Sequence, residues 1–470
     1  MTKIFLAIGI ISSVLFAFAC VQKGGEGAGG TTATGGGDTI KVGVYGDMTG
    51  QTASFGQSTR NGIQLAVDEI NNAGGIDGKK IVLVVEDDQG QPNQATTVMQ
   101  KMINQDKVQA VLGEVASTNS LAAAPVAQSA KIPMITPSST NPKVTEVGDY
   151  ISRVCFIDPF QGSAMAKFAA KSLNAKTAAI LGDVNSDYSK GLTQFFEEEF
   201  TKQGGRVVTK EAYTQNDPDF KAQLTKIRNL NPDVIYVPGY YSQVGIIARQ
   251  ARELGMNQPL MGGDGWDSPD LFKLGGGALK NAYISNHYSA ENPAPEIQNF
   301  VKNYKAKFNV VPDSLAALAY DSAKVLADAI KRAGGAGDSV KLKDAINATK
   351  DFAGVTGTIT LDASRNAVKP AVILEVDPAK PGFTFKETIY PEGMSAPTAT
   401  TTMTDANSNS MMNGNSMSNS GSMMNTNSMG SNSMNTSSMN SNSMTNGGSN
   451  MNSNMMMNSS GSNSMNGNMK

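Results

Sequence analysis

Short apolar runs alternate with longer segments of helical periodicity along residues 39–391. The runs at 40–48 and 79–88 are rich in Val and Ile, as buried strands are. Helical patterns follow them at 58–75 and 93–106. Strands that alternate with helices of this length predict right-handed βαβ units, in which helices cover both faces of a parallel sheet.

The same alternation resumes after Asp158. Apolar runs at 177–183 and 233–240 are separated by helical patterns, one of them at 189–203. The whole pattern predicts about twelve strands, more than one doubly wound sheet would hold at this length. We therefore expect an α/β fold with two domains.

In a doubly wound sheet, the ligand crevice lies at the carboxyl ends of the strands. This rule selects five segments that directly follow a predicted strand: 116–120, 138–140, 185–188, 240–242 and 264–267. The first two offer Ser and Thr hydroxyls near predicted helix starts. The other three offer aromatic rings and carboxylates.

These two kinds of side chain fit the two ends of a zwitterion. Hydroxyls such as those of Ser117 and Thr140, together with free N–H groups at helix starts, suit a carboxylate. A buried Asp264 suits an ammonium, and Tyr188 and Tyr240 suit an apolar side chain. Each residue also has a structural interpretation: helix N-caps for the hydroxyls, packing for the tyrosines and a turn for the aspartate.

Composition and motif content give no support to an enzyme. The chain has 39 Lys and Arg against 41 Asp and Glu, so it lacks the basic excess typical of nucleic-acid binding. The single histidine, His287, rules out a multi-histidine metal site, and two cysteines cannot build a zinc site. Neither a GxSxG elbow nor a phosphate-binding GxxxxGK loop occurs. We expect no catalytic residue, no metal and no cofactor.

The first 20 residues predict a secretory signal. One Lys precedes about fifteen apolar or small residues, too few for a membrane span, and Ala19 and Cys20 follow. This ending resembles a bacterial lipoprotein signal, in which the cysteine carries lipid; an uncleaved anchor helix is the alternative. Residues 21–38 contain eight Gly and almost nothing to bury, so we expect a flexible tether.

Residues 392–470 have a strongly biased composition. The last 70 residues hold 16 Met, 19 Asn and 19 Ser, with NSM-like units repeating every five residues from Met429 to Met444. Such a segment cannot offset the entropy of ordering its backbone, so we expect a disordered tail. Its thioethers could bind Cu(I), and a solvated surface brush is the simpler interpretation.

Several motifs of the central region resemble a known family. IKVGVYGDMTG, NGIQLAVDEINNAGG, EDDQGQP, MITPSST, DPFQG, NSDYSKG and GGDGWDSP occur in this order. Over about residues 39–390 they resemble the branched-chain amino-acid binding proteins, which are extracytoplasmic solute-binding proteins of ABC importers. The resemblance implies two Rossmann-like lobes with parallel sheets, joined by a three-strand hinge that closes on the ligand.

The resemblance also sets expected boundaries within the chain. The lobes would comprise residues 39–157 with 289–363 (lobe 1) and residues 158–288 with 364–391 (lobe 2). The three crossovers between the lobes are expected near 155–159, 286–289 and 362–369.

The family's site residues carry over onto nine positions. The resemblance implies that Ser117 and Thr140 bind the ligand carboxylate and that Ser138 and Ser139 supply backbone contacts. Asp264 corresponds to the acidic partner of the ligand ammonium, which is Glu in the leucine binder. The apolar part of the pocket falls on four residues: Phe55, Tyr188, Tyr240 and Leu315.

Together these features predict a non-enzymatic binding protein of an ABC importer. It would be a monomer, anchored by lipid on Cys20 to the periplasmic or extracellular face of the membrane. It would capture amino acids, branched-chain ones above all, and deliver them to a permease. Two alternatives remain open: a sensor module for small amides or other solutes, and a soft-metal-binding surface protein that acts through its Met-rich tail.

Overall fold

The computed structural model describes residues 39–394, which belong to one compact unit. The expected signal peptide, Cys20, the Gly-rich tether and the Met-rich tail lie outside the described residues.

Five parallel strands form the first sheet, in the order β2-β1-β3-β4-β5. In the register of β1 with its two neighbours, Val42 lies opposite Leu83 on one side and Ala110 on the other. The order places β1 inside the sheet, where both of its edges are paired. The strands are β1 (Ile40–Gly46), β2 (Ile81–Asp87), β3 (Ala110–Leu112), β4 (Met134–Thr136) and β5 (Ile151–Arg153).

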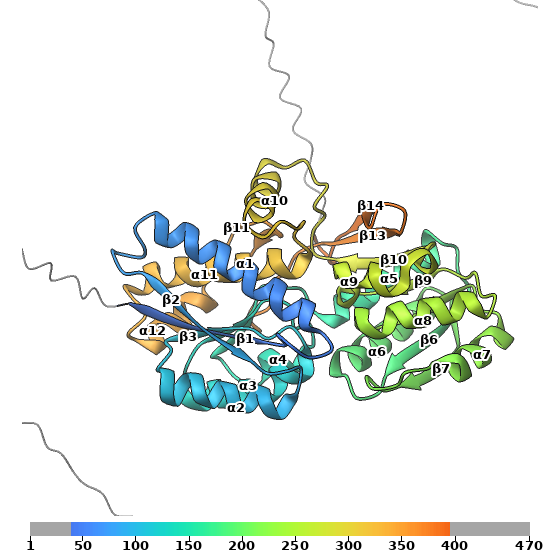
Figure 1. Ribbon diagram of the computed structural model, residues 1–470, viewed down its shortest axis with the longest axis horizontal. Helices are drawn as coiled ribbons and strands as arrows, with labels where there is room; N and C mark the ends of the chain where they lie inside the picture. Colours follow the sequence, from blue (N-terminus) through green and yellow to red (C-terminus); the bar gives the residue numbers. More distant parts are fainter. Residues whose placement is uncertain (1–38, 395–470) are drawn as a thin grey trace, which may run out of the picture. The chain divides into compact units, whose positions relative to one another are not determined.

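Helices cover both faces of this sheet because successive strand side chains point in opposite directions. Val42 and Val44 pack with residues of α1, α11 and α12, whereas Tyr45 packs on the other face with residues of α2 and α3. Figure 1 shows α1 and α11 on one side of this sheet and α2 and α3 on the other. We call this sheet and its helices lobe 1. The helices are α1 (Ala53–Asn72), α2 (Pro92–Lys101), α3 (Ser117–Ala130), α4 (Lys143–Glu146), α10 (Pro295–Phe308), α11 (Ser314–Ala333) and α12 (Ser339–Asn347).

Seven strands form the second sheet, in the order β14-β13-β10-β9-β8-β6-β7. The five strands from β10 to β7 are parallel, and β13 and β14 extend the sheet in antiparallel fashion. The strands are β6 (Thr177–Asp183), β7 (Arg206–Tyr213), β8 (Val234–Tyr236), β9 (Leu260–Gly262), β10 (Ala282–Asn286), β13 (Ala371–Asp377) and β14 (Gly382–Ile389).

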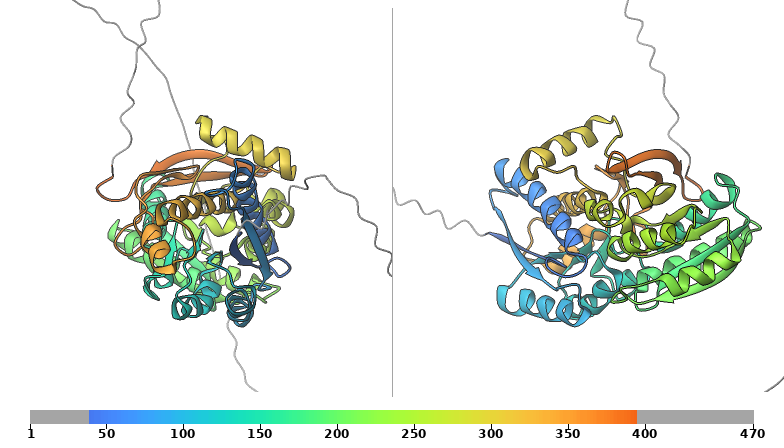
Figure 2. Two further views of the ribbon diagram at one scale, coloured as in Figure 1. Left: turned by 90° about the vertical axis from the view of Figure 1, so that its left-hand side faces the viewer. Right: turned by 45° about the vertical axis from the view of Figure 1, so that its right-hand side comes forward.

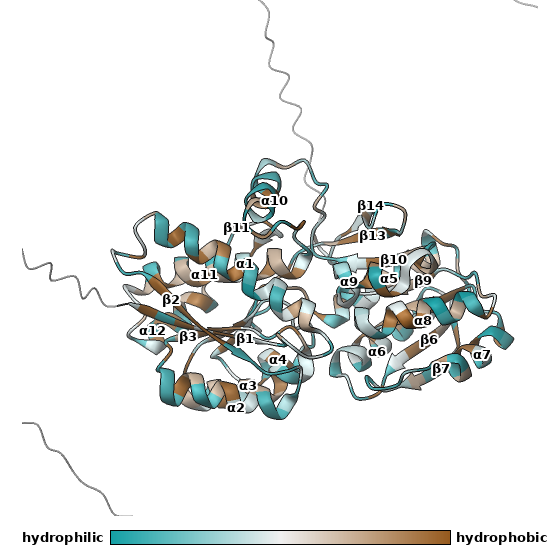
Figure 3. Ribbon diagram, viewed as in Figure 1, coloured by the Kyte–Doolittle hydropathy of each residue, from teal (hydrophilic) through white to brown (hydrophobic). Residues whose placement is uncertain are grey.

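The second sheet is also covered on both faces, and together with its helices it forms lobe 2. Ala178 and Ile180 pack against α5 and α6, and Ala179 and Leu181 pack against α7, α8 and α9. In Figure 3 the strands are mostly brown, and teal residues lie on the outer helix faces. The helices are α5 (Asp158–Lys171), α6 (Asp187–Lys202), α7 (Lys221–Leu230), α8 (Tyr241–Glu253) and α9 (Pro269–Gly275).

The chain passes between the two sheets three times (Figure 2). It crosses after β5 into α5, returns after β10 into α10, and crosses again between the small hairpin β11–β12 (Phe352–Gly354 and Gly357–Ile359) and β13. The predicted α/β class with two lobes is therefore confirmed.

Candidate functional site

Side chains of the two lobes contact each other directly where the strands of both sheets end. The Thr118 hydroxyl donates to the Asp187 carboxylate at 3.0 Å and accepts from the Asp187 N–H at 2.9 Å. The Ser54 and Ser268 hydroxyls meet at 2.8 Å. These contacts join the N-terminal turns of α1 and α3 to lobe 2, so the structure represents a closed conformation.

A small cavity lies between the two walls of this closed cleft. Its lining combines residues of both lobes: Phe55, Val115, Ser138, Tyr188, Tyr240, Asp264, Gly265 and Leu315. Six of the nine residues predicted to bind ligand are among them. The cavity holds about 10 Å³, the room of roughly one water molecule. The walls must therefore move apart to admit a larger solute.

The apolar part of the cavity is built from stacked aromatic rings. Tyr188 and Tyr240 lie parallel at 5.2 Å between centroids, and Phe55 meets Tyr240 edge-on at 5.6 Å. Gly265 lies close beneath them, because a Cβ there would come within 2.9 Å of the Tyr240 ring and 2.8 Å of the Gly239 carbonyl oxygen. Leu315, in the first turn of α11, is also buried in the lining.

Asp264 follows β9 and begins a short 3-10 turn, Asp264–Trp266. Its side chain is buried, and three side chains surround its carboxylate. Oδ1 accepts from Gln161 Nε2 at 2.7 Å and from the Tyr188 hydroxyl at 2.9 Å, while Oδ2 lies 2.9 Å from His287 Nε2. The carboxylate is thus fixed in place by hydrogen bonds alone.

His287 does not neutralise Asp264. Burial lowers the pKa of His287 to about 4, although the Asp264 carboxylate acts in the opposite direction. The imidazole is therefore neutral at pH 7, and its Nε2–H donates to Asp264. Because Gln161 and Tyr188 are neutral as well, none of the three donors supplies a counter-charge to the Asp264 carboxylate. A buried charge without a counter-charge is costly, which makes Asp264 a candidate partner for a cationic group of a ligand.

The hydroxyl wall in lobe 1 divides into side chains with and without protein partners. Ser138 Oγ is buried without a hydrogen-bond partner and lines the cavity. The Thr140 hydroxyl forms no well-aligned hydrogen bond with a protein group; it lies near the Asp158 carboxyl and acts to lower its pKa. Ser117 Oγ accepts from the Asn141 N–H at 3.3 Å.

Ser139 points away from the cavity. Its hydroxyl lies 2.9 Å from both the Glu114 and the Val115 carbonyl oxygens and 2.7 Å from Ser120 Oγ, inside lobe 1. The structure therefore brings Ser138 to the cavity, whereas Ser117, Ser139 and Thr140 lie outside its lining.

Two residues beside Asp264 were missed from the sequence. Gln161 is in the first turn of α5, and His287 directly follows β10. His287 could have been found by the rule of strand carboxyl ends, which also applies to β10. Gln161 carries no such signal, because only the crossover of the chain brings α5 beneath Asp264.

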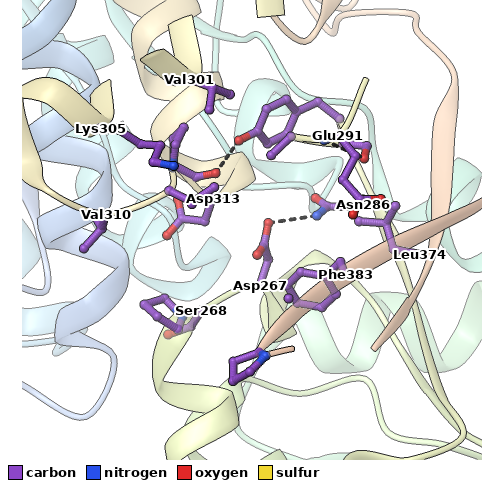
Figure 4. Close-up of a pocket in the computed structure, with 18 of the residues that line it drawn as sticks. Asp267, Ser268, Asn286, Glu291, Val301, Lys305, Val310, Asp313, Leu374 and Phe383 are labelled. Atoms are coloured by element: carbon purple, nitrogen blue, oxygen red, sulfur yellow. Dashed lines mark hydrogen bonds between the residues drawn. The ribbon is translucent and has the colours of Figure 1, made fainter. Parts of the chain in front are cut away.

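A second, larger cavity of about 640 Å³ lies between α9, α10 and the β13–β14 hairpin (Figure 4). It contains none of the nine predicted residues. In Figure 4, Asp267 points towards Asn286, whose amide donates to it at 2.8 Å, and Asp313 lies on the neighbouring wall. We therefore take the smaller cavity as the candidate ligand site, because it contains the predicted aromatic residues and Asp264 although it has the smaller volume.

Within residues 39–394, no group of three or more His, Cys, Asp and Glu side chains is arranged to hold a metal ion. Over the same residues, no helix is both long and apolar enough to cross a membrane.

Comparison with known proteins identifies the family. Residues 39–381 match the family model described as periplasmic binding protein, so the chain belongs to this family of extracytoplasmic binding proteins. The Leu/Ile/Val-binding protein homolog 3 of Brucella melitensis is 30% identical over 334 residues, which cover 71% of this chain and 89% of that protein.

Solved structures agree with this assignment. A leucine binding protein from Thermotoga maritima has a TM-score of 0.72 at 40% identity, covering 76% of this chain and 100% of that one. A branched-chain amino-acid transporter substrate binding protein from Streptococcus pneumoniae, in complex with isoleucine, has a TM-score of 0.71 at 37% identity, covering 75% and 100%. The recognised resemblance to branched-chain amino-acid binding proteins is confirmed.

Proposed function

We propose that this protein is the solute-binding component of an ABC importer and captures amino acids, branched-chain ones above all, in the cleft between its lobes. One observation carries the proposal. The buried Asp264 carboxylate is held only by neutral donors, and it lines the same cavity as Phe55, Tyr188, Tyr240 and the unpartnered hydroxyl of Ser138.

Each part of a branched-chain amino acid has a complementary group in this cleft. The ammonium pairs with Asp264 and recovers the cost of that buried charge. The carboxylate accepts from Ser138 and Thr140 and from backbone N–H groups, with Ser117 at the start of α3 as a further donor. The aliphatic side chain packs on the aromatic rings and Leu315.

Binding and closure are coupled in this mechanism. The ligand first contacts the hydroxyl wall of the open lobe 1, and lobe 2 then brings Asp264, Tyr188 and Tyr240 onto it. The three crossing segments act as the hinge, and the closed form is stabilised by the contacts that the ligand makes to both lobes. The permease recognises that closed form, and the ligand leaves chemically unchanged.

Calorimetric titration of the full-length protein tests this proposal. The protein is freed of ligand by unfolding and refolding, and it is then titrated with the twenty amino acids and a few amides. We expect tight one-to-one binding of Leu, Ile or Val. If the refolded protein unfolds cooperatively but binds none of these compounds, the amino-acid assignment is wrong, and so are the roles proposed for Asp264 and Ser138.

Uptake assays test the delivery step. A strain that lacks this protein should lose high-affinity import of the bound amino acid, and the wild-type gene should restore it. Unchanged import in that strain would instead indicate a sensor that reports the ligand to a signalling partner.

The proposal includes anchoring of a monomer to the outer face of the cell membrane. Its support is the apolar run before Ala19 and Cys20 and the Gly-rich stretch that follows. Mass spectrometry of the mature N-terminus should find lipid on Cys20, and Cys20→Ser should release the protein from membranes. A membrane-bound Cys20→Ser protein would indicate an uncleaved anchor instead.

A further inference from the structure

Arg153 is a buried cation directly behind the hydroxyl wall of lobe 1. It is the last residue of β5, just before the first crossing, and its side chain is fully buried. Its guanidinium donates to the carbonyl oxygen of Ser139, to that of Asn141 at 2.7 Å and to that of Pro142 at 3.3 Å. A fourth bond of 3.3 Å goes to the Thr145 hydroxyl. The Arg153 side chain therefore holds residues 139–145, the segment that directly follows Ser138.

These contacts fix the direction of the Thr140 N–H. The Ser139–Thr140 peptide bond is trans, so its C=O and N–H point in opposite directions. Because Arg153 binds the Ser139 oxygen, the Thr140 N–H points away from Arg153. A broken contact to Arg153 would release this peptide.

The positive charge of Arg153 has no full counter-charge nearby. All four of its hydrogen-bond partners are uncharged carbonyl and hydroxyl oxygens. Burial raises the pKa of Asp158 to about 8 and that of Cys155 to about 12, so both neighbours are mainly neutral at pH 7. Asp362 has only a minor influence on the pKa of Arg153, and its Oδ1 accepts from the Ser364 and Asn366 N–H groups.

We infer that Arg153 is a positioning residue that makes the cleft select ligands with a carboxylate. Its guanidinium orients the Thr140 N–H towards the ligand and supplies positive charge from behind the loop. The cleft then carries one buried cation in lobe 1 and one buried anion, Asp264, in lobe 2, a pattern that matches a zwitterion. This inference rests on the proposed function, since it assigns a role in binding the same ligand.

Paired ligands separate this role from a purely structural one. Leucine and leucinamide share the ammonium and the side chain, but only leucine has a carboxylate. Both are titrated against the wild type and against three variants, Arg153→Gln, Arg153→Lys and Lys369→Met. Glutamine can still donate hydrogen bonds to the loop carbonyls but carries no charge. Lysine keeps the positive charge but lacks the planar guanidinium that donates to several carbonyls at once.

Lys369 is the matched control. It is a second fully buried cation, it donates to Thr356 Oγ1 at 2.6 Å near Asp321, and it lies outside the cavity lining. Lys369→Met should change the affinity for both ligands by the same factor.

The expected result is a selective loss. Arg153→Gln should weaken leucine binding by about 10- to 100-fold, the range for a lost interaction with a charged group, and leucinamide binding by less than about threefold. Arg153→Lys should retain most of the preference for leucine. If Arg153→Gln lost the same factor of affinity for both ligands, the inference would be overturned and Arg153 would have only a structural role. A wild-type protein that binds leucine no more tightly than leucinamide would also overturn it.

Folding and the proposed function are checked separately. Cooperative thermal unfolding of each variant shows that it is folded. If Arg153→Gln does not fold, the test rests on Arg153→Lys, which must keep at least about a tenfold preference for leucine, or 1.4 kcal/mol, for the inference to stand. A folded wild type that binds no amino acid contradicts the proposed function, and the inference then fails with it.

Discussion

The two walls of the cleft differ in the kind of polar group that each presents. The lobe 1 wall has the hydroxyls of Ser138 and Thr140 over a loop held by the buried guanidinium of Arg153. The lobe 2 wall has the Asp264 carboxylate between the ring of Tyr188 and the imidazole of His287. One wall thus has donors and positive charge, and the other has an acceptor with negative charge.

This difference explains why closure and binding belong together. Each charge is buried and fixed by neutral partners, so it cannot move to meet the other, and each wall alone satisfies one end of a zwitterion. A ligand with both charges gains its full electrostatic stabilisation when both walls contact it, and this gain favours the closed form.

Removal of the charge on the lobe 2 wall should have the largest effect. Asp264→Ala should weaken leucine binding by about a hundredfold or more, because an ammonium left unpaired in a closed cleft costs roughly 2–5 kcal/mol. Calorimetric titration measures the effect, and Asp270→Ala is the control, because Asp270 is a partly exposed aspartate on α9 that pairs with Lys273. A change below about threefold would remove Asp264 from the ligand site.

Neighbouring serines on the lobe 1 wall should separate binding from stability. Ser138→Ala should weaken leucine binding about tenfold and leave the free energy of unfolding unchanged or higher, because its hydroxyl is buried without a protein partner. Ser139→Ala should instead lower that free energy by about 1–2 kcal/mol, since it removes contacts to the Glu114 and Val115 carbonyls. Calorimetric titration measures leucine binding by both variants, and urea unfolding measures their free energies of unfolding. If Ser139→Ala weakened binding and Ser138→Ala lowered stability, the roles of the two serines would be exchanged.

A contact between the walls should have a smaller effect. Thr118→Val keeps the shape of the side chain but removes both bonds to Asp187, so the closed form becomes less stable. We expect affinity to fall by about three- to tenfold, with faster ligand dissociation measured by stopped-flow fluorescence. Thr96→Val on α2, whose hydroxyl bonds carbonyl oxygens within lobe 1, is the control. Unchanged dissociation would mean that this contact does not stabilise closure.

The smallest effect concerns the larger cavity, where the two lobes bring like charges together. Asp313 in lobe 1 is partly buried near Asp267 in lobe 2, and desolvation, with the charge of Asp267 as a further cause, raises the pKa of Asp313 to about 7. The folded protein therefore binds more protons at Asp313 than the unfolded chain between about pH 4 and 7, so this group makes stability fall as pH rises through that window.

Asp313→Asn should reduce this pH dependence. Asparagine can still accept from the Ala316 N–H at the start of α11, so the helix cap is kept. The melting temperature of the wild type should fall by more than that of Asp313→Asn between pH 5 and pH 8. His287 acts with the opposite sign, because its lowered pKa removes stability below pH 6.5, and it is common to both proteins. Identical pH profiles would show that Asp313 titrates normally.

Much of the site could be located from the sequence because the chemistry lies where strands end. Ser138 follows β4 and Asp264 follows β9, and both line the same cavity. The rule of strand carboxyl ends places such residues along one edge but does not give side-chain direction. Ser139 therefore looked equivalent to Ser138, although it points into lobe 1 and bonds to carbonyls there.

The sequence by itself determined the α/β class, the two lobes and the segments that form the cleft, because strands and helices leave local patterns of apolar residues along the chain. Only the tertiary structure decided which groups meet across the lobes. Gln161 and His287 reach Asp264 from segments 103 and 23 residues away, and Arg153 reaches the loop from behind. Burial also decides that His287 is neutral at pH 7, because the cost of desolvating a charged imidazole depends on everything packed around it.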